Sequence, residues 1–146
     1  MPQRAQLLPD PEQREILMNT LSRANIASNA ARARLLNEQG ADARAVVKEE
    51  VARLGLPAAL AGPIVKRVTA QLRGPKFSAY QALALPASLA KWPATDRVTL
   101  ATAAGRRTIP VYVDPTRGDL RAPLDGHDVA LVLRNGEFEL VAEDGS

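Results

Sequence analysis

Residues 97–144 read RVTLATAAGRRTIPVYVDPTRGDLRAPLDGHDVALVLRNGEFELVAED and carry the clearest fold signals in the chain. Their residues alternate between apolar and polar, which is typical of β-strands that bury one face. Two segments, VALVLR and EFELVAE, flank Asn135-Gly136, and these two residues tolerate the positive φ angles of a type I′ turn. They therefore predict a β-hairpin, and a second strand pair is predicted around Gly105.

The chain before residue 95 shows helical spacing of its apolar residues instead. Asp10 and Gln13 have the spacing of a capping box, and Pro11 lies at the first helical position, where its missing N–H costs nothing. We therefore predict one long helix from Pro11 to about Gln39.

Three further segments complete the predicted architecture. Helices are expected over residues 42–55 and 57–74, and residues 76–90, which contain Pro86, are expected to form a short helix or an irregular ordered segment. With a short strand at residues 4–8, the strands number about five, which fits a small barrel but also a sheet of two strand pairs packed on the helices. The predicted fold class is α+β in either case.

Positive charge is concentrated in the helical part of the chain. Residues 1–91 contain thirteen Lys and Arg against seven Asp and Glu, and from Val51 to Thr95 there are six basic residues and no acidic one. Solvated surfaces usually mix both signs, so this distribution favours a polyanionic partner such as nucleic acid. The alternative explanation is codon preference in a GC-rich genome, which enriches Arg and Ala without any role in binding.

The sequence offers no constellation of catalytic residues. There is no cysteine, which excludes disulfides and thiolate-bound zinc. The single histidine, His127, lies in a turn and is expected to be an exposed loop residue rather than a base or a ligand. No apolar run has the length of a membrane span or the form of a signal peptide, so we expect a cytoplasmic protein with no membrane partner. We therefore expect a binding protein without a cofactor rather than an enzyme.

The predicted nucleic-acid contacts are polar and basic side chains on the helices and on one strand. Asn25, Asn29 and Arg32 lie on one stripe of the first helix, where helix propensity does not explain two asparagines. The alternative for them is a satisfied hydrogen bond between helices. The other predicted contacts are Lys66, Arg67, Arg73, Lys76, Arg106 and Arg107. Tyr80 and Trp92 are aromatic residues able to stack on a base, although burial is the favoured role of Trp92.

Four segments of the chain, taken in order, match the pattern of a known family. The first covers the start of the long helix and its asparagines: Pro11, Glu12, Gln13, Asn25 and Asn29. The second follows in the later helices: Leu54, Gly55, Leu56, Ala58, Ala61, Ile64 and Val68. The third is the first strand pair: Val98, Leu100, Thr102, Gly105, Arg106, Ile109 and Pro110. With the hairpin from Asp128 to Leu140, they resemble the N-terminal half of the TnpB-type transposon-encoded RNA-guided nucleases, the ancestors of type V CRISPR effectors.

The resemblance implies a small OB-like antiparallel β-barrel, the wedge, with a helical recognition lobe inserted between its strands. It implies the first wedge strand at residues 1–9, the recognition lobe at residues 10–91 and the remaining wedge strands at residues 92–146. The implied partners are guide RNA and target DNA. The acidic residues and the four-cysteine zinc ribbon of the RuvC nuclease that follows in the family are not found in these 146 residues, so we expect a nuclease-free module.

Three functions stay open on the sequence. The first is a nucleic-acid-binding module of an RNA-guided DNA-targeting system, acting beside a separately encoded RuvC-type subunit or with a second copy of itself. The second is a guide-independent DNA-binding transcriptional regulator. The third is a protein–protein adaptor that docks through its acidic C-terminal hairpin.

Overall fold

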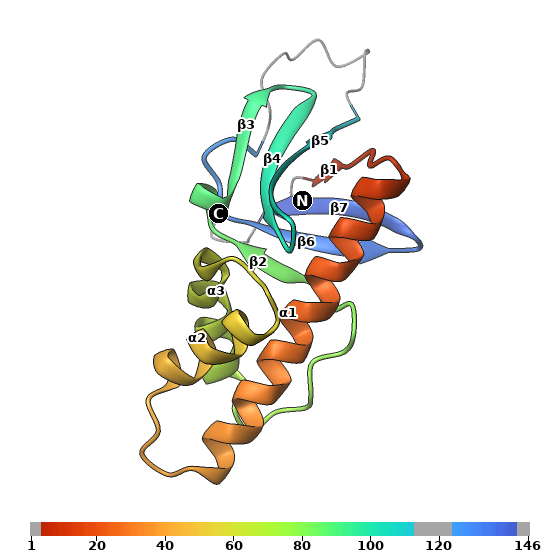
Figure 1. The fold of residues 1–146 in the computed structure, drawn as a ribbon. Coiled ribbons are helices and arrows are strands. Elements are labelled where there is room, and N and C mark those ends of the chain that lie inside the picture. The colour runs from red at the N-terminus through yellow and green to blue at the C-terminus, as the bar shows by residue number, and fades with distance from the viewer. Residues whose placement is uncertain (1–3, 113–123, 143–146) are drawn as a thin grey trace.

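The computed structural model describes residues 4–112 and 124–142, which form three α-helices beside two antiparallel sheets (Figure 1). The α+β class is therefore confirmed for the described residues. In Figure 1 the helices occupy the lower part of the molecule and the sheets the upper part, and the long helix α1 runs along both.

Helix α1 (Pro11–Asn37) begins where the sequence predicts and ends slightly before the expected Gln39. The Asp10 side chain accepts a hydrogen bond at 2.7 Å from the backbone N–H of Gln13, and the Gln13 side chain accepts one at 3.0 Å from the N–H of Asp10. The predicted capping box is confirmed. It satisfies two of the N–H groups that a helix start leaves without partners.

Helices α2 (Ala43–Arg53) and α3 (Ala61–Ala70) pack on α1 and on each other, with a single 3₁₀ turn, Ala58–Leu60, between them. Helix α3 is shorter than the predicted 57–74. Pro63 lies in its first turn, where the absent N–H is tolerated, and this places the helix start just before the proline. Helix α1 buries three small residues, Ala24, Ala27 and Ala31.

The strands are short and antiparallel throughout. In chain order they are β1 Arg4–Gln6, β2 Leu83–Leu85, β3 Ala90–Ala94, β4 Arg97–Thr102, β5 Gly105–Pro110, β6 Val129–Arg134 and β7 Glu137–Ala142. One sheet has the order β1-β7-β6-β2 and the other has the order β3-β4-β5. Both predicted strand pairs, β4–β5 and β6–β7, are confirmed.

Within residues 4–112 and 124–142, the strands do not close into the barrel that the resemblance implies. On one side, an isolated bridge between Leu7 and Val111 links the two sheets. On the other side, Pro86 and the 3₁₀ turn Ala87–Leu89 separate β2 from β3, so these strands pair with different sheets. Proline has no N–H to continue a ladder, which explains the break. Residues 76–90, expected to be a short helix or an irregular segment, thus include strand β2.

The β6–β7 hairpin depends on two residues in the left-handed region. Asn135 has a φ of 53° and Gly136 a φ of 80°, as the predicted type I′ turn requires. Such a turn matches the right-handed twist of the strands that it joins. The local sequence therefore sets the register of this hairpin.

Replacing Gly136 by alanine is expected to lower the free energy of unfolding by about 1–2 kcal/mol, because a Cβ is strained at this φ. Gly62→Ala is the matched control: the glycine lies in α3, its φ is not positive, and an added Cβ meets no atom within 4 Å. This control is expected to stabilise the protein by about 0.5–1 kcal/mol, since alanine is the better helix former. Urea unfolding measures both, and equal effects would contradict the role given to the turn.

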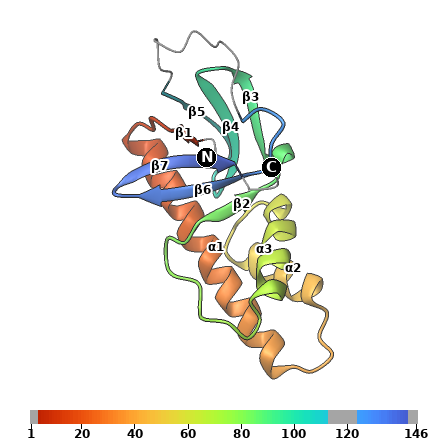
Figure 2. The ribbon, with the colours of Figure 1, turned by 180° about the vertical axis from the view of Figure 1, so that it is seen from behind.

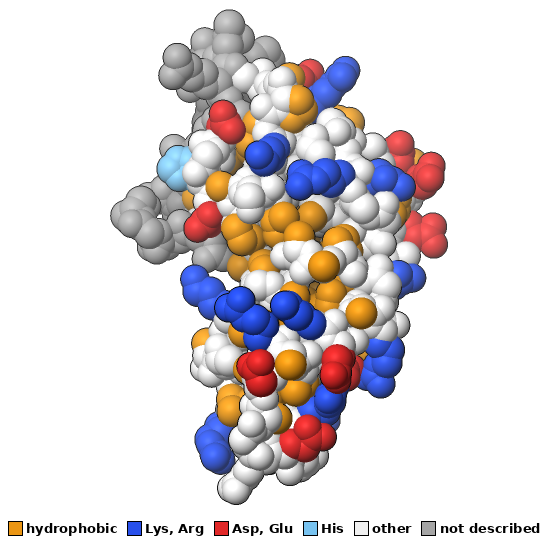
Figure 3. Space-filling model, turned by 60° about the vertical axis from the view of Figure 1, so that its left-hand side comes forward, with side chains coloured by type: hydrophobic (Ala, Val, Ile, Leu, Met, Phe, Trp, Pro, Cys, Tyr) orange, Lys and Arg blue, Asp and Glu red, His pale blue; other side chains and the backbone are white. Residues whose placement is uncertain are grey.

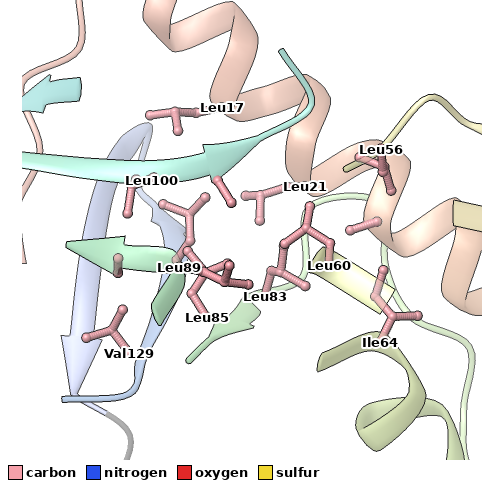
Figure 4. Close-up of a cluster of buried hydrophobic side chains, with 14 of the residues drawn as sticks. Leu17, Leu21, Leu56, Leu60, Ile64, Leu83, Leu85, Leu89, Leu100 and Val129 are labelled. Atoms are coloured by element: carbon pink, nitrogen blue, oxygen red, sulfur yellow. The ribbon is translucent and has the colours of Figure 1, made fainter. Parts of the chain in front are cut away.

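A single hydrophobic core joins the helices and the sheets. Figure 4 shows side chains from α1, α3, the 3₁₀ turns and the strands meeting between the two parts of the molecule. The labelled residues are Leu17, Leu21, Leu56, Leu60, Ile64, Leu83, Leu85, Leu89, Leu100 and Val129. Because the core is shared, the helices hold a defined position on the sheets.

Candidate nucleic-acid interface

Between α3 and β2 the chain has no regular secondary structure over residues 71–82, and we call this segment the strap. Figure 2 shows it from behind, alongside α1. Asn29 of α1 holds the strap at Phe77: its amide donates to the Phe77 carbonyl at 2.9 Å and accepts from the Phe77 N–H at 2.9 Å. The Asn29 side chain therefore bonds to both backbone groups of Phe77, as the backbone of a neighbouring β-strand would.

Asn25 is 1% exposed and uses both ends of its amide. Its Nδ2 donates to the carbonyls of Ala79 and Gln81, each at 3.1 Å, and its Oδ1 accepts from Nη2 of Arg67 at 2.8 Å. The Arg67 guanidinium carbon lies 4.3 Å from the centroid of the Phe77 ring. Burial lowers the pKa of Arg67 to about 10, so the group stays charged at neutral pH. Arg67 therefore faces inward and joins α3 to α1.

Arg32 completes the stripe on α1 by donating to two strap carbonyls, that of Gln71 at 3.3 Å and that of Gly74. The predicted stripe of Asn25, Asn29 and Arg32 thus lies on one side of α1, and its donors bind the strap. This arrangement resembles the alternative role considered for these side chains, which is hydrogen bonding within the protein. Contact of these three side chains with nucleic acid stays a prediction.

Three other predicted contacts, Lys66, Arg73 and Lys76, are exposed. Lys66 lies on α3, while the other two lie on the strap. Their chain neighbours within the run from Val51 to Thr95 include no acidic residue. These side chains are therefore accessible to an anionic ligand.

Arg106 and Arg107 are exposed at the start of β5, beside a hairpin turn that is held on α1. The hydroxyl of Thr20 accepts from the N–H of Ala103 at 2.8 Å, which fixes the position of the turn. Successive strand residues point to opposite faces of a sheet, so the two arginines point to opposite sides. They therefore do not grip one phosphate together in this strand.

Some basic side chains are already paired with acids at the junction of α1 and α2. Arg34 lies 2.8 Å from Glu49 and 2.9 Å from Glu50, and Arg53 also pairs with Glu50. The Glu50 residue is buried, and its charge is balanced by these arginines. Positive charge is therefore partly neutralised at this junction.

A second acid-free run, from Ile16 to Asn37 of α1, was not among the features predicted from the sequence. The structure places this run beside the strap, which belongs to the first run, residues 51–95. The exposed Arg23 belongs to the second run and was not among the predicted contacts. A count of acidic residues along the first helix would have found the run, but only the fold shows that the two runs are neighbours.

Figure 3 shows one face of the molecule on which hydrophobic atoms gather at the level where the helices meet the strands. Lys and Arg side chains lie above and below this apolar area, and most Asp and Glu side chains lie farther out. His127 and Trp92 were also singled out in the sequence. His127 is exposed in a turn, as expected, and Trp92 is half-buried against the core.

Over residues 4–112 and 124–142, no group of three or more His, Cys, Asp or Glu side chains is placed to hold a metal ion. Within the same ranges, no helix has both the length and the apolar character needed to cross a membrane. Comparison of the chain with models of protein families, with curated proteins and with solved structures finds no match. The likeness to TnpB-type proteins therefore stays an inference from the residues.

Proposed function

We propose that this protein is a nucleic-acid-binding module of an RNA-guided DNA-targeting system of the TnpB type. The helices would serve as the recognition lobe and the two linked sheets as the wedge, and together they hold guide RNA and target DNA. In such systems base pairing with the guide selects the sequence, while the protein recognises shape and backbone charge. The module itself does not cut, and it acts with a separately encoded RuvC-type subunit or with a second copy of itself.

The observation that carries this proposal is the packing of two acid-free runs against each other. Residues 16–37 and 51–95 contain no Asp or Glu, and hydrogen bonds from α1 to the strap join them. The exposed cations of the first run, residues 51–95, include Lys66, Arg73 and Lys76. Cations brought together without acids attract phosphates, because each contact releases condensed counterions from the nucleic acid.

The interior of the same region supports a binding surface of stable shape. The side-chain amides of Asn25 and Asn29 bond to the backbone of the strap, so the strap is held without a ligand. A surface that is ordered in advance loses less entropy on binding than one that must fold. This supports a binding role for the exposed face.

Isolation of the tagged protein from its native host, followed by sequencing of the RNA that accompanies it, tests the proposal. A discrete bound RNA is expected. Protein free of RNA that nevertheless shifts duplex DNA in a gel would favour the guide-independent regulator. Protein that binds neither nucleic acid would favour the adaptor, and both of these results would overturn the guide-dependent function.

A further inference from the structure

Tyr80 is an aromatic side chain displayed from a fixed part of the strap. It is 44% exposed, whereas the carbonyls on both sides of it, those of Ala79 and Gln81, accept hydrogen bonds from the buried Asn25. A turn is also closed across it, since the Gln81 N–H donates to the Ser78 carbonyl at 3.2 Å. The Gln81 side chain in turn accepts from the Ser78 N–H at 3.1 Å. The backbone at Tyr80 is therefore held in place, while a substantial part of the residue is exposed to solvent.

The strap that carries Tyr80 and the helix α1 that holds it both expose apolar or basic side chains. Ile26 follows Asn25 on α1 and is 51% exposed. Arg73 and Lys76 are exposed on the same strap, and neither the strap nor residues 16–37 of α1 contribute an acid. An exposed ring on the same segment as exposed cations is a combination that binds single-stranded nucleic acid, because bases stack on the ring while cations follow the phosphates.

We propose that Tyr80 stacks on an unpaired base of a single-stranded nucleic acid whose phosphates contact Arg73 and Lys76. This inference rests on the proposed function only in that the protein binds nucleic acid. A duplex does not fit this site, because its base faces are covered by their stacked neighbours, whereas a single strand exposes them. The chemistry is shared by RNA and DNA single strands.

Fluorescence anisotropy with a labelled oligouridylate tests the site. Tyr80→Ala is expected to weaken binding by about tenfold, the typical effect of losing one stacked base. Tyr80→Phe keeps the ring and is expected to keep the affinity. The salt dependence of Tyr80→Ala is expected to match that of the wild type, whereas Lys76→Gln lowers the slope of log K against log salt by about 0.7, the value for one phosphate contact on a single strand.

Tyr112→Ala is the matched control, because Tyr112 is also an exposed tyrosine, at 54%, but lies outside both acid-free runs. It is expected to bind oligouridylate like the wild type, and the same strand paired with oligoadenylate is expected to bind Tyr80→Ala and wild type equally. Oligothymidylate distinguishes single-stranded RNA from single-stranded DNA as the ligand. If Tyr80→Ala loses the same affinity for oligothymidylate, the site binds single-stranded DNA as well as RNA.

These experiments distinguish failure of the stacking site from failure of nucleic-acid binding as a whole. If Tyr80→Ala binds oligouridylate as tightly as the wild type, the stacking site is wrong while nucleic-acid binding survives. An equal loss for Tyr112→Ala would also overturn the site. If the wild type binds none of the probes, both the stacking site and the proposed function are wrong.

Discussion

Replacing Asn25 by alanine is expected to lower the free energy of unfolding by about 4 kcal/mol, because one buried amide serves groups on both the strap and α3. The substitution leaves the carbonyls of Ala79 and Gln81 without their donor. It also leaves the inward-facing guanidinium of Arg67 without the acceptor that it meets at 2.8 Å. Urea unfolding followed by circular dichroism measures the loss.

Asn19→Ala is the control for this substitution. Asn19 lies on the same helix but is exposed, so its replacement is expected to change the free energy of unfolding by no more than about 0.5 kcal/mol. If both variants unfold at the same urea concentration, the hydrogen bonds of Asn25 do not hold the strap. That outcome would also remove the reason for treating the backbone at Tyr80 as fixed.

Reversing the charges of Arg106 and Arg107 to glutamate is expected to weaken nucleic-acid binding by about a hundredfold at physiological salt. Two phosphate contacts are lost and two repulsive charges are added. The slope of log K against log salt is expected to fall by about two for duplex DNA, because fewer counterions are released on binding. A salt titration of binding by fluorescence anisotropy measures both quantities.

The double reversal of Arg44 and Lys48 on α2 is the matched control. Both residues are exposed, and their reversal changes the net charge by the same amount. An equal loss of affinity in the two double variants would assign the effect to net charge and not to β5. The single reversals then separate the two arginines, since they point to opposite faces of the strand. Wild-type affinity of the double variant at β5 would contradict the choice of this site.

The sequence predicted well those features that depend on neighbouring residues. The capping box at Asp10 and the left-handed turn at Asn135-Gly136 are both present, because each is decided by residues a few positions apart. The strand pair around Gly105 is present for the same reason. The short strand β2 was missed, since its pairing partner β6 lies far along the chain and three residues carry too little pattern.

The candidate site was predicted less completely. The exposed Lys66, Arg73 and Lys76 remain accessible contacts, whereas Arg67 faces inward and bonds to Asn25. All four are basic residues in one acid-free run, so charge alone could not separate them. For the two residues on α3, the side of the helix that packs on α1 decides that Arg67 faces inward and that Lys66 reaches solvent.

By itself the sequence determined the α+β class, the helix start at Asp10, the turn at Asn135-Gly136 and the uneven distribution of charge. Only the tertiary structure decided that two acid-free runs lie together, that the asparagines of α1 hold the strap and that the strands form two linked sheets. The physical reason is the separation along the chain between the residues that interact. Caps and turns are set by contacts within a few residues, but Asn25 meets the Ala79 carbonyl across 54 positions of the chain. An asparagine has the same local pattern whether its amide faces water or a distant carbonyl, so its role is settled only by packing.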